Sequence, residues 1–317
     1  MKKLNVTWDG VFDSTGYLFS FAKSLSCAVK CASLRRLGDS GAPAREAFPP
    51  ELAEDIVASS GFAFRMWVSP DLCPSATSIW QFDLQKSGVE NGGLRCHYIE
   101  RLWGQEDMEA ERRREAIERI RQSIDNGIPA ISWDIGVCEW GLIIGYDDET
   151  EKFAVLPITG REEEMDYARL GKRELPILNV LTIAGKAEVP RETILSQTLV
   201  IAKHHLLGKE WCDNASGLDA YPALIGHLGN EDTELARSWN LEYFLGTYAP
   251  LKWYAWKFLE RHGAQELAAL YKTVHENWQK AFEIKKTRDM ADPENRRAMA
   301  ELLRQAEGLE RQAVDKM

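Results

Sequence analysis

The side chains best suited to chemistry in this sequence cluster around Glu139. Glu139 and its neighbour Cys138 stand in a polar break between two apolar runs, residues 130–133 and 141–146. A carboxylate in such a place can accept a proton or bind a cation. The residues that we expect to line a ligand site with it are Trp133, Asp134, Cys138, Trp140, Tyr146 and Asp147. Carboxylates beside aromatic rings suit a cationic or amine ligand, because a ring face attracts positive charge.

Two residues near the N-terminus are further candidates for catalysis. Asp13 and Ser14 stand at the expected start of the first helix, where free backbone N–H groups favour a carboxylate and an N-cap. If Asp13 and Glu139 lie close together, the two carboxyl groups could share a proton and act as acid and base. The simpler interpretation is structural: Asp13 caps its helix, and Glu139 bonds a backbone group or an arginine.

A thiol and an imidazole offer a different chemistry. Cys73 lies in a turn-rich loop over residues 69–80, and His97 is the only histidine before position 204. A Cys73 thiol activated by the His97 imidazole is the sharpest enzymatic hypothesis, because a nucleophilic cysteine needs a base to take its proton. An inert Cys73 and a surface or hydrogen-bonded His97 form the simpler alternative.

No pattern of metal ligands or cofactor contacts accompanies these residues. Cys27 and Cys31 are four residues apart, but no Cys or His follows them at the spacing of a zinc site. His204 and His205 are adjacent, so on a helix their side chains point about 100° apart and do not easily grip one ion. The stretch 136–141 lacks the lysine of a phosphate-binding loop. We therefore expect neither a metal nor a cofactor.

Composition narrows the classes of partner. The 317 residues carry a formal net charge of -10, which disfavours nucleic acid and anionic membranes because both would repel the chain. The first residues reach Asp9 before the apolar core of a signal peptide can form. No apolar run approaches the roughly 20 residues of a membrane span. Six cysteines without a dense framework indicate reduced thiols, so we expect a cytoplasmic protein.

Helices and strands alternate before residue 188. Apolar residues at helical spacing predict one helix over 12–37 and another over 106–126, which ends at Gly127. A loop is predicted over 38–50, a short helix over 51–58 and a strand over 60–65. Further strands are predicted over 130–133, 141–146, 152–156 and 176–183.

From Pro190 onward the sequence predicts helices alone. They are expected over 190–207, 216–228, 233–262, 264–286 and 293–314. Pro250 should kink or split the third of these, because proline lacks the N–H of a helical hydrogen bond. Together these patterns predict an α+β domain over residues 1–187, followed by an all-α domain over 188–317.

The order of these parts resembles the butirosin biosynthesis protein H family. Three short motifs carry the resemblance, which would cover nearly the whole chain: Phe12-Asp-Ser-Thr-Gly-Tyr-Leu18, Ser60-Gly-Phe-Ala-Phe64 and Glu139-Trp-Gly-Leu-Ile-Ile-Gly-Tyr-Asp147. The resemblance implies a papain-like N-terminal domain with a mixed or antiparallel sheet and a helical region after it. It also implies acyl transfer from a carrier-protein thioester to an aminoglycoside amine, through an acyl-cysteine.

The catalytic residue types of that family are missing here. In the family the N-terminal helix starts with a His-Cys pair, and the second strand of the pair starts with a His. Carried over by position, the cysteine falls on Asp13 and the histidine on Glu139, while Gly145, Tyr146 and Asp147 match. A shift of one residue would place Ser14 at the nucleophile position without restoring a histidine.

Three functional hypotheses follow. The first is a papain-like protein that binds a small polar, amine or amide ligand without the chemistry of a Cys-His pair. The second is an active acyltransferase or amide hydrolase that uses Cys73 or Ser14, with His97, Glu139 or Asp147 as helpers. The third is an assembly module in which the aromatic-rich helices over 233–286 form the face of a homodimer.

Overall fold

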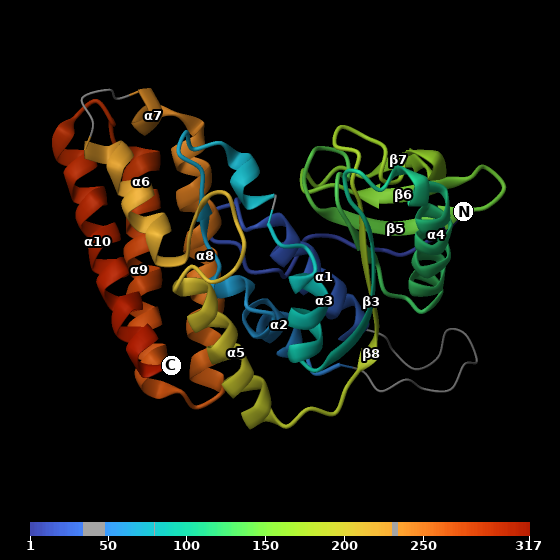
Figure 1. Cartoon of the computed structure of the whole chain (residues 1–317), viewed down its shortest axis with the longest axis horizontal. Coiled ribbons are helices and arrows are strands. Elements are labelled where there is room, and N and C mark those ends of the chain that lie inside the picture. Colours follow the sequence, from blue (N-terminus) through green and yellow to red (C-terminus); the bar gives the residue numbers. More distant parts are fainter. Residues whose placement is uncertain (34–47, 79, 230–233) are drawn as a thin grey trace. The chain divides into compact units, whose positions relative to one another are not determined.

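The structure is a computed structural model that describes residues 1–33, 48–78, 80–229 and 234–317 (Figure 1). It mixes helices and strands, with an antiparallel sheet followed by a mainly helical C-terminal region. None of the helices in these described ranges has both the length and the apolar character that crossing a membrane requires.

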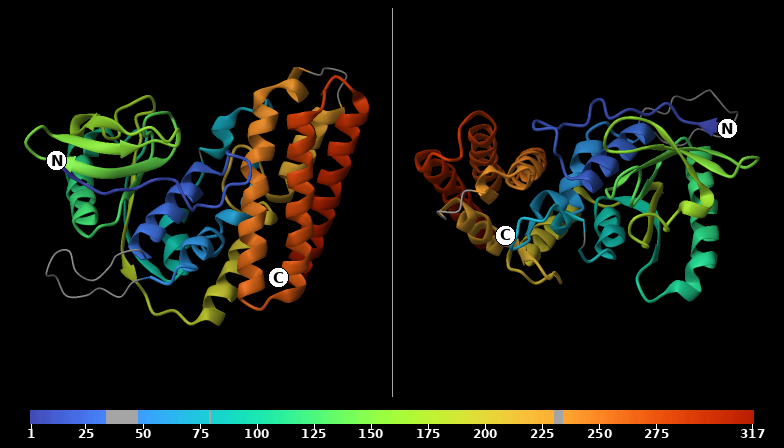
Figure 2. Two further views of the ribbon diagram at one scale, coloured as in Figure 1. Left: turned by 180° about the vertical axis from the view of Figure 1, so that it is seen from behind. Right: turned by 90° about the horizontal axis from the view of Figure 1, so that it is seen from above.

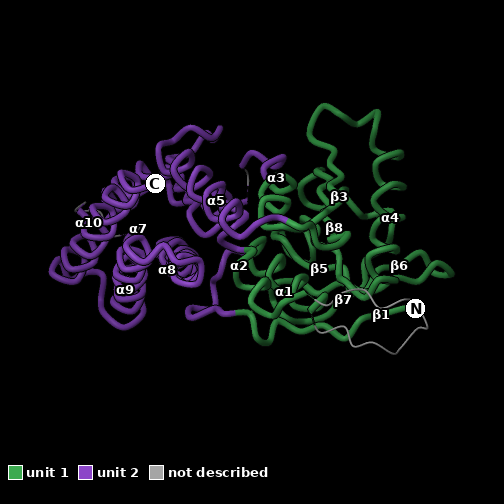
Figure 3. The backbone as a smooth tube through the Cα atoms, turned by 90° about the horizontal axis from the view of Figure 1, so that it is seen from below, with its two compact units in different colours: residues 1–11, 20–56, 85–188 green, residues 12–19, 57–84, 189–317 purple. Residues whose placement is uncertain are grey.

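The chain divides into two compact units that interleave along the sequence (Figure 3). Unit 1 comprises residues 1–11, 20–56 and 85–188. Unit 2 comprises residues 12–19, 57–84 and 189–317. Two internal segments, 12–19 and 57–84, therefore fold with the C-terminal helices and not with the residues that flank them.

Unit 1 is built on a seven-stranded sheet whose neighbouring strands all pair antiparallel. Its strands are β1 Lys2–Lys3, β3 Leu94–Arg101, β4 Ala130–Ser132, β5 Gly141–Asp147, β6 Lys152–Leu156, β7 Glu163–Asp166 and β8 Leu178–Lys186. The spatial order is β3-β8-β4-β5-β6-β7, and β1 pairs with the far end of β5. Ile131 of β4 lies between Leu142 of β5 and Leu181 of β8, so the β4–β5 hairpin forms the middle of the sheet.

Three helices of unit 1 accompany this sheet: α1 Ser20–Ser33, α3 Leu84–Asn91, which begins one residue before the unit boundary, and α4 Glu109–Asp125. Helix α1 contacts β4 and β5. Helix α4 buries Ala116, Ile120 and Ile124 in one cluster with Ile143 and Val180 of the sheet. Each large apolar side chain buried in this way contributes about 1.5–3 kcal/mol to holding the helix in place. A further helix, α2 Leu52–Ser59, crosses the boundary between the units.

Unit 2 is mainly a bundle of helices. They are α5 Arg191–Leu206, α6 Ala220–Gly229, α7 Glu234–Arg237, α8 Trp239–Arg261, α9 Gln265–Thr287 and α10 Pro293–Lys316. The three longest, α8, α9 and α10, are consecutive in the chain and lie side by side (Figure 2). The short strands β2 Trp67–Val68 and β9 Ala215–Ser216 pair antiparallel. Ser238 and Asp292 cap α8 and α10, since their side chains accept backbone N–H groups of the first turn.

The segment 12–19 packs on α8 and α9. Phe12 stacks on Trp253 of α8 with 3.8 Å between the ring centroids. The Tyr17 hydroxyl donates a hydrogen bond of 2.6 Å to Glu242. Phe12 and Tyr17 stand at a spacing that is typical of a helix. In the structure, however, their rings pack on the helical bundle.

The same segment supplies a hydrogen bond that α8 lacks at Pro250. Pro250 lies inside this helix and has no N–H to give to the carbonyl of Gly246, four residues earlier. The Thr15 hydroxyl donates to that carbonyl at 2.6 Å. Gly246 also makes room for the segment, because a Cβ there would lie 2.7 Å from the Tyr17 ring. Helix α8 therefore runs through Pro250 unbroken, so of the two predicted outcomes, a kink or a split, the split does not occur.

Two other predictions are wrong. The first helix begins at Ser20 rather than at residue 12, because residues 12–19 belong to unit 2; positions 34–37 of that predicted helix and 38–47 of the predicted loop lie outside the described residues. The predicted strand over 60–65 is a 3₁₀ turn at Phe62–Phe64, entered through Gly61 with φ of 87°. Both aromatic rings of that turn are fully buried, so the alternation seen in the sequence does not reflect a two-sided strand.

The most periodic segments are confirmed. Helix α4 lies inside the predicted range 106–126, with residues 106–108 as a 3₁₀ turn before it. Strands β4, β5, β6 and β8 and the helices α5, α9 and α10 each lie within a few residues of their predicted ranges. Strands β3 and β7 and helix α3 were not predicted.

Candidate functional site

Glu139 stands in a tight loop between β4 and β5. The N–H of Ile135 donates to the Glu139 carbonyl at 3.1 Å, and the N–H of Glu139 donates to the Val137 carbonyl at 2.6 Å. Gly136 adopts φ of +76°, and a Cβ at this position would lie 2.3 Å from the Pro157 ring. Only glycine fits there, so the loop that carries Glu139 is closely packed and its backbone conformation is fixed.

A second loop clamps this turn from the side. The Arg173 guanidinium donates to the carbonyl oxygens of Asp134 at 3.3 Å and Gly136 at 3.0 Å. The Asp134 carboxylate accepts the N–H groups of Glu174 at 2.8 Å and Leu175 at 3.3 Å. Burial raises the pKa of Asp134, although these donors and Arg173 act in the opposite direction. Asp134 therefore has a structural task in joining the two loops.

The side chain of Glu139 meets the first residue of helix α1. The Ser20 hydroxyl donates to Glu139 Oε2 at 2.5 Å and accepts the N–H of Trp140 at 3.4 Å. Helix α1 is held there by its apolar side, since Phe21 packs edge-on against Trp140 at 5.0 Å between centroids. Ser20 is only 4% exposed, whereas Glu139 is half-buried. A hydroxyl at a helix N-terminus and a carboxylate ahead of a strand are thus brought into direct contact.

Two other groups stand near Ser20 and Glu139 in the sequence. Lys23 stands one helical turn after Ser20, and its ammonium lies 5.8 Å from the centroid of the Trp8 ring. Burial raises the pKa of the Cys138 thiol to about 11, and Asp134 and Glu139 add to the effect. The Cys138 thiol is therefore protonated near neutral pH, which makes it a poor nucleophile.

The structure gives Asp13 and Ser14 places in unit 2. Asp13 Oδ1 accepts the N–H groups of Gly16 at 2.9 Å and Leu18 at 3.2 Å, so it closes a turn ahead of α1. The Ser14 hydroxyl donates to Gln279 of α9 at 2.9 Å. Neither residue is the first residue of α1, because that position belongs to Ser20.

Cys73 and His97 belong to different units. Cys73, in unit 2, lies at the start of a 3₁₀ turn with its sulfur 3.0 Å from the Ser75 hydroxyl. His97, in unit 1, is exposed on β3, and partial burial together with the nearby Arg119 lowers its pKa. Strands β8 and β4 separate β3 from β5, so His97 is not brought to Glu139.

The aromatic and acidic residues expected around Glu139 are dispersed. Trp133 and Trp140 are 3% and 0% exposed and contact each other at 5.4 Å between centroids, so their faces belong to the core. The Tyr146 hydroxyl donates to Asp125, and Asp147 pairs with the N-terminal amine. Tyr146 and Asp147 end β5, which puts them roughly 20 Å of strand away from Glu139.

Ser20 is the residue that sequence reasoning missed. The prediction of a helix over 12–37 places the helix start eight residues too early. A serine directly before the apolar run from Phe21 onward is a usual sign of a helix N-terminus. That sign was present in the sequence and would have singled out Ser20.

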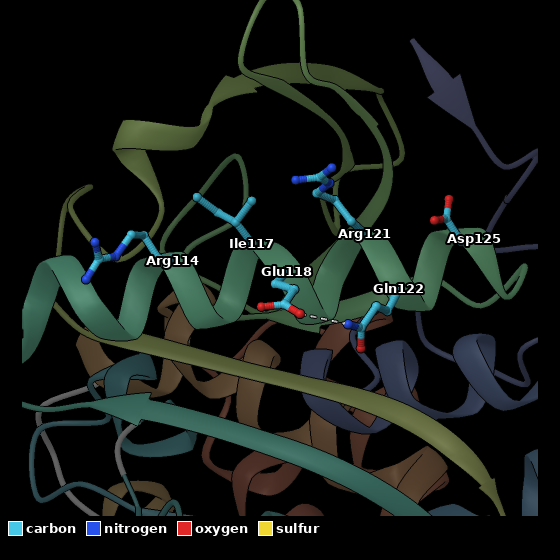
Figure 4. Close-up of a pocket in the computed structure, with 6 residues that line it drawn as sticks. All are labelled: Arg114, Ile117, Glu118, Arg121, Gln122 and Asp125. Atoms are coloured by element: carbon cyan, nitrogen blue, oxygen red, sulfur yellow. Dashed lines mark hydrogen bonds between the residues drawn. The ribbon is translucent and has the colours of Figure 1, made fainter.

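A cavity of about 570 Å³ lies elsewhere in unit 1, along the outer face of α4 (Figure 4). Its lining residues all come from this one helix: Arg114, Ile117, Glu118, Arg121, Gln122 and Asp125. Positive and negative side chains alternate along it, and Gln122 donates to Glu118 at 3.1 Å. None of the residues considered for chemistry lines this cavity.

Unit 2 holds a buried ion pair between two of its long helices. Lys252 of α8 and Glu310 of α10 are both fully buried and lie 2.8 Å apart. The Tyr221 hydroxyl donates to the second Glu310 oxygen at 2.9 Å and accepts the Trp278 indole N–H. Burial lowers the pKa of Lys252, and Glu310 opposes this by favouring the ammonium.

A second buried network joins Arg65, His205 and Glu210. The Arg65 guanidinium and the Glu210 carboxylate are 2.7 Å apart, and His205 Nδ1 lies 2.7 Å from the other oxygen. His205 Nε2 accepts the N–H of Met66 at 2.9 Å, so both ring nitrogens are engaged. Burial lowers the pKa of His205. Burial opposes ionisation of Glu210, but His205 and Arg65 lower its pKa overall.

Within the described residues, no three or more Cys, His, Asp or Glu side chains are grouped so as to hold a metal ion. Neither family models nor curated protein sequences give a match to this chain. The contact of Ser20 with Glu139 joins a hydroxyl and a carboxylate, two groups that can take part in proton transfer.

Proposed function

We propose that unit 1 is a papain-like domain in which Ser20 and Glu139 occupy the places of the catalytic cysteine and histidine. The proposal is supported by the order of parts, a helix followed by an antiparallel sheet. It is also supported by the contact of the first residue of α1 with the residue that precedes β5. The butirosin-type register shifts accordingly, from Asp13 to Ser20.

The proposed function is reversible binding of a small amine- or amide-bearing molecule at Glu139. One observation carries it: a half-buried carboxylate lies at the end of a hairpin, fixed by its own loop and by Arg173. A carboxylate held in this way attracts an ammonium or an amide N–H more strongly than a mobile one, because its entropy is already restricted.

Binding can be tested with ethylenediamine as the probe and ethylene glycol as its uncharged analogue. Isothermal titration of the full chain should detect the diamine and not the diol. Glu139→Gln should weaken diamine binding about 10-fold or more, since a hydrogen bond to a charged group is worth roughly 1.5–3 kcal/mol. Glu149→Gln, in the exposed turn after β5, is the matched control. Equal affinity of the wild type and Glu139→Gln would exclude this site.

A reducing compartment such as the cytoplasm is part of the proposal. All six cysteines lie in the described part of the chain, and each is a free thiol. The alternative of an assembly module has less support. Phe244, Tyr248 and Phe258 are almost fully buried, and Trp239 is the aromatic residue of that region with an exposed side chain, at 53%.

A further inference from the structure

The first turn of α1 carries a serine and a lysine three positions apart. The sequence Ser20-Phe-Ala-Lys23 has the spacing S-x-x-K, and residues three apart lie on the same side of a helix. In serine acyl-transfer enzymes of the penicillin-binding class, this spacing places a nucleophilic serine at a helix start with a lysine beside it. In this chain the serine also touches a carboxylate, Glu139, at 2.5 Å.

We propose that Ser20 is a nucleophile that accepts an acyl group, with Glu139 as the acceptor of its proton and Lys23 as a nearby positive charge. This inference goes beyond reversible binding and does not depend on an amine being the ligand. It assigns the covalent step to Ser20, which neither the Cys73–His97 hypothesis nor the Ser14 hypothesis contains.

The reaction balances without an additional reagent. The Ser20 oxygen attacks the carbonyl carbon of an ester, thioester or amide, and its proton passes to Glu139. The bond from that carbon to the leaving group breaks, and the leaving group departs with the proton from Glu139. Water or an amine then attacks the acyl-serine and gives a proton to Glu139, and this proton returns to the Ser20 oxygen as the acyl product leaves.

The position of Ser20 favours charge that develops during this reaction. The first N–H groups of a helix have no partner within the helix, and the helix dipole places partial positive charge there. These groups and the Lys23 ammonium would stabilise the oxyanion of the tetrahedral intermediate. Glu139 is already within hydrogen-bond reach of the proton that it has to accept.

The burial of Ser20 sets the size of the acyl donor. With 4% of its surface exposed, Ser20 admits a small acyl or sulfonyl group and excludes a bulky one in this conformation. Acetyl esters and methanesulfonyl fluoride are therefore the probes of choice.

The test uses the full chain with methanesulfonyl fluoride and p-nitrophenyl acetate. Mass spectrometry of the labelled wild-type protein should find a single sulfonyl adduct, and peptide mapping should place it on Ser20. The release of p-nitrophenolate should show an initial burst. Ser20→Ala should abolish both signals. Ser24→Ala should keep them, since this equally buried serine lies one turn further along α1 and its hydroxyl has no hydrogen-bond partner in the described residues.

Two more variants test the assigned roles. Glu139→Gln keeps the shape but not the basicity of the side chain, so the burst rate should fall about 100-fold. Lys23→Arg keeps the charge and should stay within about threefold of the wild type, whereas Lys23→Met should lose about 10-fold. Lys30→Ala, in the last turn of the same helix, is the control.

An unlabelled Ser20 in the folded wild-type protein would overturn the proposal, and so would an adduct on Cys138. An active Glu139→Gln together with an inactive Lys23→Arg would overturn the assignment of the proton acceptor. Because acylation is read directly from the wild-type protein, it can fail while diamine binding succeeds, and the reverse also holds.

Discussion

Glu139 of unit 1 and Glu310 of unit 2 both accept a hydrogen bond from a hydroxyl group, yet their surroundings differ. Glu310 is fully buried within a helix and pairs with the Lys252 ammonium as well as with Tyr221. Glu139 is half-buried in a loop, where the ends of a helix and a strand meet.

Glu310 therefore has a structural role, whereas the position of Glu139 suits the ligand binding and proton transfer proposed for it. A fully buried ion pair must satisfy all its partners from within the fold, which fixes the register of the helices that carry it. A half-buried carboxylate on a clamped loop keeps access to a ligand while its backbone stays in place. The buried charges of unit 2 lie in closed networks, whereas Glu139 of unit 1 is only half-buried.

The largest effect is expected when the closed network is broken. Lys252→Met leaves Glu310 buried without its cation and should lower the free energy of unfolding by about 3–5 kcal/mol, measured by urea denaturation. Lys257→Met removes a partly exposed lysine from the same helix and should cost less than about 1 kcal/mol. The double variant Lys252→Met/Glu310→Leu should recover most of the loss. A double variant as unstable as Lys252→Met would contradict the ion-pair explanation.

The next largest loss of stability is expected at the hydrogen bond from Thr15 to α8. Thr15→Val leaves the Gly246 carbonyl without the hydroxyl that replaces the missing N–H of Pro250, so it should cost about 1–3 kcal/mol. In a Pro250→Ala background the alanine N–H can bond that carbonyl, and the same change should cost clearly less. Urea denaturation of the four proteins forms a double-mutant cycle. Equal costs of Thr15→Val in both backgrounds would show that the two sites are not coupled.

The His205 network adds a dependence on pH. Since burial lowers the pKa of His205 from its ordinary 6.5, its stabilising effect is complete above that value and is lost as pH falls below it. The lowered pKa of Glu210 extends the loss to pH below 4.5. Between pH 7 and 5, the free energy of unfolding should fall with pH less steeply in His205→Gln than in the wild type. The two slopes should differ by up to about 1.4 kcal/mol per pH unit. The exposed neighbour His204 is the control, and His204→Gln should keep the wild-type slope.

The smallest change in stability, together with a clear change in ligand binding, is expected at Arg173, which holds the loop of Glu139 in unit 1. Arg173→Ala removes two hydrogen bonds to the loop of Glu139 and should cost about 1 kcal/mol. Because Glu139 then loses its fixed position, diamine binding should weaken several-fold by isothermal titration. Arg169→Ala, an exposed arginine shortly before it, should change neither quantity. Unchanged binding by Arg173→Ala would mean that the clamp does not position Glu139.

Local patterns in the sequence predict those elements whose boundaries depend on nearby residues. Helix α4 shows its apolar stripe and its glycine stop within one stretch, and α10 begins with Asp292 and Pro293, a capping residue and a favoured first residue. The approximate position of the loop with Glu139 was found in the same way, from two apolar runs around a polar break.

Contacts between distant residues could not be predicted in this way. Phe12 and Tyr17 have helical spacing, but their partners Trp253 and Glu242 lie more than two hundred positions later in the chain. Misplacing this segment moved the helix start from Ser20 to Asp13, and the candidate nucleophile moved with it. Trp133 and Trp140 are almost fully buried, and this burial depends on packing between distant residues that a local pattern does not contain.

The interleaving of the two units has a consequence for synthesis on the ribosome. Segments 12–19 and 57–84 emerge early, but the helices on which they pack, α5, α8 and α9, are complete in sequence only at Thr287. Until then their aromatic side chains have no native surface to cover, although the sheet of unit 1 is complete in sequence by residue 188. The aromatic side chains of these two segments are therefore exposed to aggregation or chaperone capture while residues 189–287 are translated.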